Sequence, residues 1–284
     1  MCCKKSLFAC PVCGNALMIN GKSYKCIDNH SFDAAKSGYV NLLTSDRMNA
    51  KNPGDNKLMV KSRSDFLDKG YYVHLLEKLC ESVYEVISEN DVILDAGCGE
   101  GYYTSGIYNY LRERGMTVQS AGIDISKYAV DKAAKRCHDI EYAVGSIFHI
   151  PVSDSSSDIL LSVFAPFCCE EFVRVINDGG YMIMVIPGRK HLWELKSIVY
   201  EKPYENNPKS EYIEGFKFLK RYNVQKEIAL ESNEDILSLF AMTPYFYNTR
   251  TEDRKKLSEL NYLKTNTEFE ILMYRKGAVS YTHL

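Results

Sequence analysis

The chain has 284 residues, of which 45% are hydrophobic and 25% are charged, and its formal net charge is −2. This composition is typical of a globular protein with a sizeable core. No run of 18 apolar residues occurs and no apolar segment follows the N-terminal lysines, which excludes a transmembrane helix and argues against a secretory signal. The ten cysteines are scattered or have metal-ligand spacing, so a reducing cytoplasm is expected.

Two pairs of metal-binding residue types lie near the N-terminus. Cys10 and Cys13 are followed by Cys26 and His30, in the pattern C-x2-C-x12-C-x3-H. Three thiolates and one imidazole suit tetrahedral zinc, and because all four positions are filled the site is predicted to be structural. Asn20-Gly21 between the pairs predicts a hairpin turn in a small β-rich module. The alternative is a free-thiol loop with an incidental histidine.

Pattern and charge divide the chain into four segments. We predict a zinc-binding module at 1–43, a linker at 44–63, an α/β domain at 64–276 and a candidate non-native tail at 277–284. If the module is independent, the domain should bind its cofactor without it.

The N-terminal part of the chain is basic, whereas the remainder is acidic. Residues 1–74 hold 11 Lys/Arg against 6 Asp/Glu, and the remaining residues hold 24 against 31. This asymmetry favours a phosphate-bearing partner, although solvated surface charge explains any single lysine equally well. The candidate phosphate contacts of the linker are Arg47, Lys51, Lys57, Lys61 and Arg63.

Strand and helix patterns alternate through the second half of the chain. Helical periodicity over 64–88 comes first. Strands are predicted at 92–97, 118–124, 140–145, 158–165, 180–186, 222–230 and 268–275. Helices are predicted at 102–114, 126–137, 168–176, 189–200, 233–240 and 252–260, and 201–220 is interpreted as an insertion. The alternation predicts an α/β fold with a doubly wound, Rossmann-like parallel sheet, which binds ligands at the carboxyl ends of its strands.

A glycine-rich loop follows the first of these strands. Asp95 ends the apolar run, and Gly97, Gly99 and Gly101 then have G-x-G-x-G spacing before a helix. Strand, tight loop and helix let the backbone approach a nucleotide-like cofactor closely, and the loop resembles that of the S-adenosylmethionine (SAM)-dependent methyltransferases. A purely structural turn is the alternative.

Two further positions follow strand ends. Asp124 ends the second strand, where a carboxylate can accept hydrogen bonds from ribose hydroxyls, or can simply support the helix cap at Ser126. Phe167, after Pro166, is a candidate for stacking on a target base, or a hydrophobic plug. Either Glu170 or Glu171 could assist deprotonation, although acids near a helix N-terminus need no catalytic explanation.

Several motifs together resemble the bacterial 23S ribosomal RNA guanine-N1 methyltransferase family of the RlmA type. They span about residues 8 to 276 and include Cys10-Pro-Val-Cys13, Lys36-Ser-Gly38-Tyr39-Val40-Asn41-Leu42-Leu43, Pro53-Gly54-Asp55, Leu94-Asp95-Ala-Gly97-Cys98-Gly99-Glu100-Gly101 and Pro187-Gly188-Arg189-Lys190-His191-Leu192. The resemblance implies zinc ligands at Cys10, Cys13, Cys26 and His30, and SAM contacts at Tyr72, Gly99, Glu100 and His191. It also implies a homodimer that acts on 23S rRNA.

The expected reaction is methylation of N1 of a guanine in a domain II hairpin of 23S rRNA, with SAM as methyl donor and Zn²⁺ as structural metal. Some members of the family protect against macrolides, and no residue of this chain decides which guanine is modified. One alternative is a SAM-dependent enzyme acting on a small molecule, which predicts activity without RNA. A second alternative is a non-catalytic zinc and RNA-binding protein, which predicts RNA binding without methyl transfer.

Overall fold

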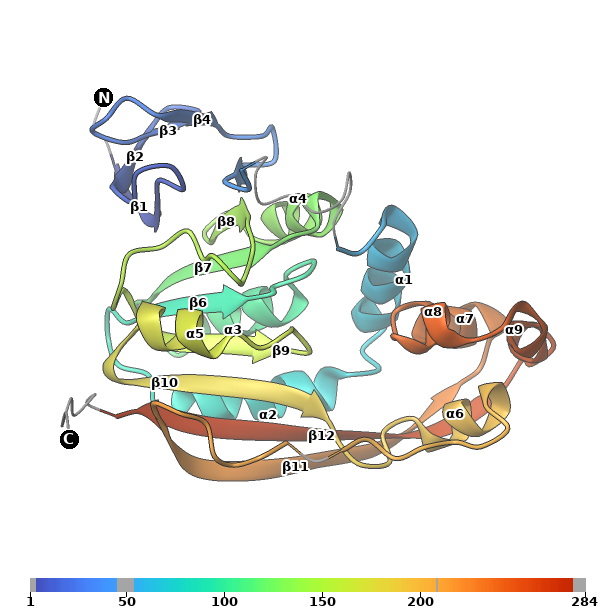
Figure 1. Ribbon diagram of the computed structural model, residues 1–284. Coiled ribbons are helices and arrows are strands. Elements are labelled where there is room, and N and C mark those ends of the chain that lie inside the picture. Colours follow the sequence, from blue (N-terminus) through green and yellow to red (C-terminus); the bar gives the residue numbers. More distant parts are fainter. Residues whose placement is uncertain (1–3, 45–53, 208, 278–284) are drawn as a thin grey trace.

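The computed structural model describes residues 4–44, 54–207 and 209–277. Residues 45–53 of the predicted linker, with Arg47 and Lys51, and residues 278–284 of the predicted tail lie outside these ranges. Figure 1 shows a small N-terminal sheet lying against one end of a larger sheet, with helices around the latter. Over the same ranges, no helix combines the length and apolar character that crossing a lipid bilayer requires.

The small sheet is antiparallel, and its four described strands follow one another in space as they do in sequence. They are β1 (Lys4–Ala9), β2 (Ala16–Asn20), β3 (Ser23–Lys25) and β4 (Ser31–Asp33). Asn20 pairs with Ser23, so the two-residue turn is formed by Gly21 and Lys22, one residue later than predicted. Gly21 takes the positive φ of 62° that such a hairpin turn requires at its first central position.

Within the described residues, the larger sheet has eight strands in the order β11-β12-β10-β9-β6-β7-β8-β5. Their bounds are β5 (Val40–Asn41), β6 (Val92–Ala96), β7 (Gln119–Asp124), β8 (Glu141–Val144), β9 (Ser157–Val163), β10 (Ile176–Pro187), β11 (Phe216–Leu230) and β12 (Leu263–Lys276). Each of the seven predicted strands has its counterpart among β6–β12. The parallel pairing predicted from the alternation is found from β10 to β5, whereas β12, the last predicted strand, runs antiparallel to both of its neighbours. The last residue of β11, Leu230, pairs with the first residue of β12, Leu263. The two strands therefore form an antiparallel pair, and the connection between them does not cross the face of the sheet.

The helices follow the predicted pattern with one break. Their bounds are α1 (Lys57–Asp68), α2 (Val73–Tyr84), α3 (Tyr102–Glu113), α4 (Lys127–Arg136), α5 (Cys169–Val175), α6 (Trp193–Val199), α7 (Asn233–Ala241), α8 (Tyr245–Asn248) and α9 (Thr251–Ser258). The single helix expected over 64–88 is two helices, because Gly70 has a φ of 81° and ends α1. The Asn56 side chain caps α1 by accepting from the N–H groups of Leu58 and Met59, so the end of the predicted linker is helical.

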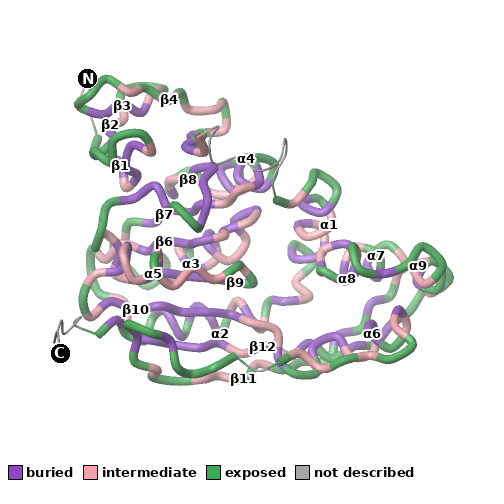
Figure 2. Tube along the Cα trace, viewed as in Figure 1, coloured by how far each residue is buried: buried purple, intermediate pink, exposed green. Residues whose placement is uncertain are grey.

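The larger sheet is covered on both faces, as a doubly wound fold requires. Along β9, Ile159, Leu161 and Val163 pack in one hydrophobic cluster with residues of α2 and α3, whereas Leu160 belongs to a second cluster with Phe172 of α5. Figure 2 shows the resulting band of buried residues along the central strands. Because side chains alternate between the faces of a strand, the apolar run of β9 serves both cores.

The N-terminal module covers part of the second face. Phe8, Leu17 and Tyr24 are buried in the same cluster as Leu94 and Ile123 of the central strands. In addition, β5 pairs in parallel with β8 and so extends the larger sheet. This packing argues against a free-standing module, since its apolar side chains and those of the sheet form one core.

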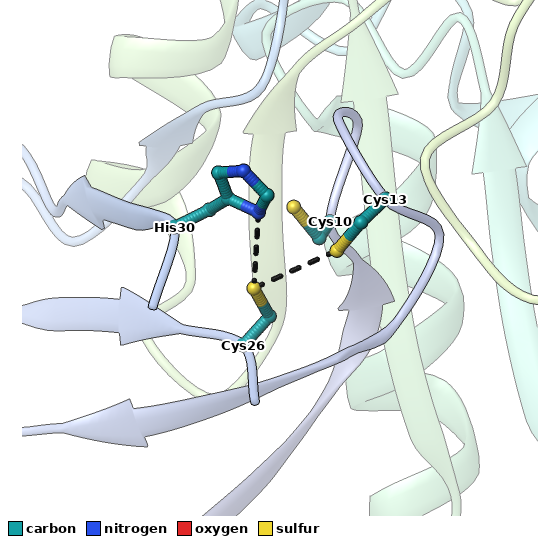
Figure 3. Close-up of side chains that lie close together, drawn as sticks. All are labelled: Cys10, Cys13, Cys26 and His30. Carbon is teal, nitrogen blue, oxygen red and sulfur yellow. Dashed lines mark hydrogen bonds between the residues drawn. The ribbon is translucent and has the colours of Figure 1, made fainter. Parts of the chain in front are cut away.

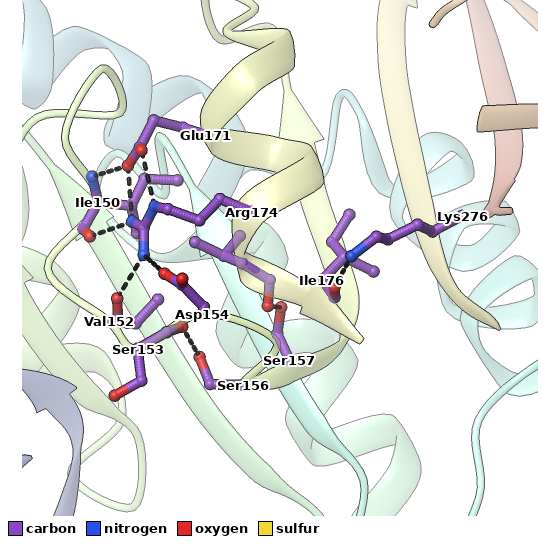
Figure 4. A network of polar contacts seen from close by, with 11 residues as sticks. Ile150, Val152, Ser153, Asp154, Ser156, Ser157, Glu171, Arg174, Ile176 and Lys276 are labelled. Carbon is purple, nitrogen blue, oxygen red and sulfur yellow. Dashed lines mark hydrogen bonds and ion pairs between the residues drawn. The ribbon is translucent and has the colours of Figure 1, made fainter. Parts of the chain in front are cut away.

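The loop of residues 150–154 in the α/β domain contacts the N-terminal module, and Arg174 holds this loop in place by hydrogen bonds (Figure 4). The guanidinium donates to both carboxylate oxygens of Glu171, to the carboxylate of Asp154 and to two carbonyls, with distances of 2.7–2.9 Å. The carbonyl of Pro151, in the middle of this loop, accepts from the N–H of Ala9 at 2.8 Å. Glu171 is therefore engaged in positioning the loop that supports the module, which is the non-catalytic interpretation of this residue.

Candidate metal centre and cofactor site

The four predicted zinc ligands converge on one point (Figure 3). The ligand atoms of Cys10, Cys13, Cys26 and His30 all lie within 4.8 Å of one another. The Sγ atoms of Cys13 and Cys26 are 3.6 Å apart, and Sγ of Cys26 is 3.4 Å from Nδ1 of His30. Bond lengths of about 2.3 Å to sulfur and about 2.05 Å to nitrogen at tetrahedral angles give separations of about 3.8 Å and about 3.6 Å. The donor set therefore fits a tetrahedral zinc ion.

The two ligand pairs lie in two tight turns, one between β1 and β2 and one between β3 and β4. Gly14, with a φ of 76°, and Asn29, with a φ of 64°, reverse the chain in them. The Asn15 side chain joins the turns, because its amide donates to Cys13 Sγ at 3.5 Å and to the Asp28 carboxylate at 2.7 Å. Hydrogen bonds from outside the ligand set orient the ligands, as in other structural metal sites.

The glycine-rich loop connects β6 to α3 at the carboxyl end of the central strands. Gly97, Gly99 and Gly101 have φ values of 97°, 55° and 79°. A Cβ on Gly97 would lie 2.5 Å from Cβ of Ala165, and one on Gly101 would lie 2.9 Å from Cβ of Ala133. Beside Gly99, by contrast, the nearest atom is 3.8 Å away. Gly97 and Gly101 thus allow close packing, whereas Gly99 leaves its backbone open to a ligand.

Asp124 is bound to this loop. One carboxylate oxygen accepts from the N–H of Gly99 at 3.0 Å and the other accepts from the N–H of Ser126 at 2.7 Å. Ser126 in turn caps α4 by accepting from the N–H of Ala129. Desolvation raises the pKa of Asp124, although these two backbone donors oppose it. Each oxygen can accept a further hydrogen bond, so support of the cap and binding of a ribose are compatible.

Asp95 has an unsatisfied buried oxygen. Its side chain is buried, and Oδ2 accepts from the hydroxyl of Thr104 at 2.5 Å, whereas Oδ1 has no partner among the described residues. Burial raises the pKa of this carboxyl to about 7. A buried polar atom without a partner is rare in folded proteins, and a ligand that donates a hydrogen bond would satisfy it. The ammonium group of the SAM methionine moiety is such a donor. Glu100 is also buried in this loop, and burial raises its pKa.

Tyr72 and His191, the contacts implied by resemblance from outside the loop, lie together. Their ring centroids are 6.3 Å apart, and both rings pack against Phe269 of β12. The N–H of Glu268 donates to Nδ1 of His191, which assigns the ring proton to Nε2. Because burial lowers the pKa of His191 to about 3, this side chain is a neutral hydrogen-bond donor.

The structure thus brings five of the predicted cofactor residues together in and beside the loop, namely Asp95, Gly97, Gly99, Glu100 and Asp124. Their roles stay predictions. Phe167, proposed as a base-stacking residue, packs edge-on against Phe172 of α5, with ring centroids 5.3 Å apart. This is the arrangement of a hydrophobic plug.

Arg63 lies beside the glycine-rich loop, a position that the sequence analysis did not predict. The sequence predicts Arg63 as a phosphate contact of the linker. In the structure it lies on α1 and forms an ion pair with Asp55. Its Nη1 is the atom that lies 3.8 Å from a Cβ built on Gly99. Burial acts to lower its pKa, but the carboxylates of Asp55 and Glu100 outweigh this effect and the pKa is raised. The pattern of α1 could have indicated a helical arginine, but only the fold brings that arginine to the loop.

Comparisons with known proteins match both parts of the chain. A family profile described as "RlmA, N-terminal" matches residues 8–51, and one described as "Methyltransferase domain" matches residues 87–242. YxjB of Bacillus subtilis (strain 168), which carries the provisional name 23S rRNA (guanine-N(1)-)-methyltransferase, is 28% identical over 95% of this chain and 98% of its own length. The 23S rRNA (guanine(748)-N(1))-methyltransferase of Streptomyces fradiae is 31% identical over 66% of this chain and 65% of its own length.

Solved methyltransferase structures are similar in fold. One of them is a chain from the complex between the Haloferax volcanii Trm112 methyltransferase activator and a provisionally named methyltransferase, with a TM-score of 0.50 and 15% identity over 80% of this chain and 100% of that chain. At this identity the similarity shows the fold alone. The zinc-ribbon profile, the methyltransferase profile and the relatives agree with the Cys3His cluster and the sheet described above. The chain belongs to the RlmA-type 23S rRNA guanine-N1 methyltransferase family, in which a zinc-ribbon N-terminus precedes a SAM-dependent methyltransferase domain.

Proposed function

We propose that this protein methylates N1 of a guanine in a domain II hairpin of 23S ribosomal RNA. The observation that carries the proposal is the pairing, in one chain, of a Cys3His ribbon with a SAM-dependent methyltransferase domain, aligned with the Bacillus subtilis relative over 95% of its residues. A methyltransferase acting on a small molecule has no need of such a ribbon. The N-terminal module is packed onto the sheet of the methyltransferase domain, so both parts can contact one RNA.

The charge of the ribbon supports a nucleic-acid substrate. Between residues 4 and 44, the five exposed lysines outnumber the two exposed aspartates, Asp28 and Asp33. The lysines are Lys4, Lys5, Lys22, Lys25 and Lys36. Phosphate contacts of this kind position an RNA without reading its sequence, so other groups near the cofactor must select the base.

The residues around the loop fit the parts of SAM. When bound, SAM supplies a methyl group that is already activated for in-line attack, so positioning accounts for most of the catalysis. We infer that the free oxygen of Asp95 accepts from the methionine ammonium and that Asp124 accepts from the ribose hydroxyls. Tyr72 and His191 would border the site from the side of β12. The target guanine must leave its base pair, because N1 lies on the pairing edge.

The resemblance to the family also predicts a homodimer and a site in 23S rRNA. The name of the Streptomyces fradiae relative specifies guanine 748 as its target. For this chain, the oligomeric state is testable by light scattering and the position of the modified base by reverse transcription.

Incubation of unmodified 23S rRNA with the protein and SAM should create one new reverse-transcription stop in domain II. N1-methylguanine cannot pair, so the polymerase halts one nucleotide before the modified base, and primer extension identifies the guanine. A reaction without SAM is the control. If SAM binds normally and no stop forms on naked RNA or on ribosomal particles, the proposed substrate is wrong, and methyl transfer to a small molecule becomes the better explanation.

Substitution of Arg63 should weaken SAM binding. The Arg63→Met variant removes the cation beside Asp55, Glu100 and Asp124, so we expect the Kd for SAM to rise about fivefold, the size typical of one lost charge-assisted contact that water partly replaces. Isothermal titration calorimetry measures it. Arg112→Met, which breaks an exposed ion pair with Asp139, is the matched control and should leave the Kd unchanged. Equal Kd values for both variants would contradict a role for Arg63.

A further inference from the structure

Phe164, the residue after β9, has a strained backbone. Its φ is 54°, in the left-handed region that a bulky side chain rarely adopts. The conformation is held by a hydrogen bond from its N–H to the carbonyl of Val185 in β10, at 3.0 Å. Strain of this kind persists where the surrounding structure enforces it, and it is concentrated at functional sites.

The strained backbone keeps the Phe164 side chain at the surface. The side chain is 44% exposed, although two aromatic rings lie beside it. Its centroid is 5.6 Å from that of Phe269, the ring that also contacts Tyr72 and His191, and 6.3 Å from that of Tyr103 at the start of α3. These neighbours hold the ring in place from one side and leave the rest of it accessible.

Phe164 lies next to the cofactor loop. Strands β9 and β6 are parallel neighbours in the sheet, so the residues that follow them meet at the same edge. The Ala165 side chain lies so close to Gly97 that a Cβ there would be only 2.5 Å away. An exposed and immobilised aromatic ring therefore stands beside the loop at which the methyl donor is proposed to bind.

We propose that Phe164 is the platform on which the target guanine stacks during methyl transfer. The assignment rests on the proposed function and extends it to the residue that orients the base. A purine taken out of its helix loses its stacking neighbours, and an aromatic side chain replaces them. Phe167 is the weaker candidate, because it is only half-exposed, its ring packs on Phe172 and the Lys209 ammonium lies 4.8 Å from its ring centroid.

The test compares variants of Phe164 in the methyl-transfer assay with 23S rRNA. Phe164→Gly removes the ring at a φ that glycine adopts freely, so the fold should persist, with an unchanged or higher Tm. The kcat/KM for RNA should fall between about 5-fold and about 150-fold, the range for loss of one stacked base. The Kd for SAM should stay within about twofold, and Phe164→Tyr should retain most of the activity. Tyr84→Ala is the control, because Tyr84 is 46% exposed but packs on Tyr110, two turns along α3 from the loop.

The outcomes separate the two proposals. Loss of RNA methylation in Phe164→Gly, with normal SAM binding and normal activity of Tyr84→Ala, supports the stacking role. Wild-type activity of Phe164→Gly would overturn it, as would a parallel loss of SAM affinity, which would assign the ring to the cofactor. If the wild-type protein itself modifies no RNA while binding SAM, the proposed function fails, and the stacking role fails with it.

Discussion

The Cys10→Ser variant should lose stability along the whole chain, with a single unfolding transition whose Tm is about 10 °C below that of the wild type. Loss of one ligand weakens zinc binding, and about 4 kcal/mol of lost stability shifts the Tm of a domain of this size by roughly that amount. The effect reaches the catalytic part because Phe8, Leu17 and Tyr24 of the ribbon share a core with Leu94 and Ile123 of the sheet. Differential scanning calorimetry with and without a chelator measures the transition.

The matched control is Cys137→Ser, which changes a partly exposed cysteine at the end of α4 that is not a ligand of the cluster. Its Tm and zinc content should match those of the wild type. Two separate transitions in Cys10→Ser, the upper one unchanged and accompanied by unchanged SAM binding, would contradict the shared core and show an independent ribbon. The single transition, by contrast, should be accompanied by a parallel loss of SAM binding.

The Asp95→Asn variant should be more stable than the wild type in the absence of ligand at pH 8, yet bind SAM at least about tenfold more weakly. The buried carboxylate has one oxygen without a partner, so its charge destabilises the apo protein. An amide keeps the hydrogen bond from Thr104 but cannot pair with an ammonium. We expect a gain on the order of 1–2 kcal/mol in the free energy of unfolding, measured by urea denaturation.

The pH dependence follows from the sign of the pKa shift of Asp95. Its pKa is about 7 in the folded protein, and about 4 is expected in the unfolded chain. Between these values the folded state holds a proton that the unfolded state has released, so this group lowers the free energy of unfolding as pH rises from about 4 to about 7, and its contribution is level above that. SAM affinity should change in the opposite direction and rise between about pH 5.5 and about pH 7.5, because the carboxylate is the form that pairs with the ammonium.

Asp139→Asn is the control for this experiment. Asp139 forms an exposed ion pair with Arg112, and its replacement should alter neither the stability profile nor the SAM affinity. If Asp95→Asn binds SAM as tightly as the wild type at pH 7.5, the free oxygen of Asp95 does not contact the ammonium group and the proposed orientation of the methionine moiety is wrong.

Local hydrophobic patterns predicted most of the helices and strands, but they did not predict how these elements pack against one another. Strand β9 was recognised as an apolar run, but the alternation of Leu160 with Ile159 and Leu161 between two cores depends on what lies on each face. The break at Gly70 was missed because helical periodicity continues on both sides of it. The sequence predicts β12 as a strand but does not give its antiparallel direction, because that direction depends on the path of α7–α9 and hydrophobic periodicity does not contain it.

Residue spacing was enough to identify the four ligands of the metal centre, the glycine-rich loop and Asp124, since each depends on a few residues within one turn or at one strand end. Which groups complete the site depends on how the chain folds. Arg63 and Phe164 lie about a hundred residues apart, and both reach the loop because the carboxyl ends of parallel strands and the helix that faces them meet at one edge. The free oxygen of Asp95 and the exposure of Phe164 likewise depend on packing and not on spacing, so no local pattern could have revealed them.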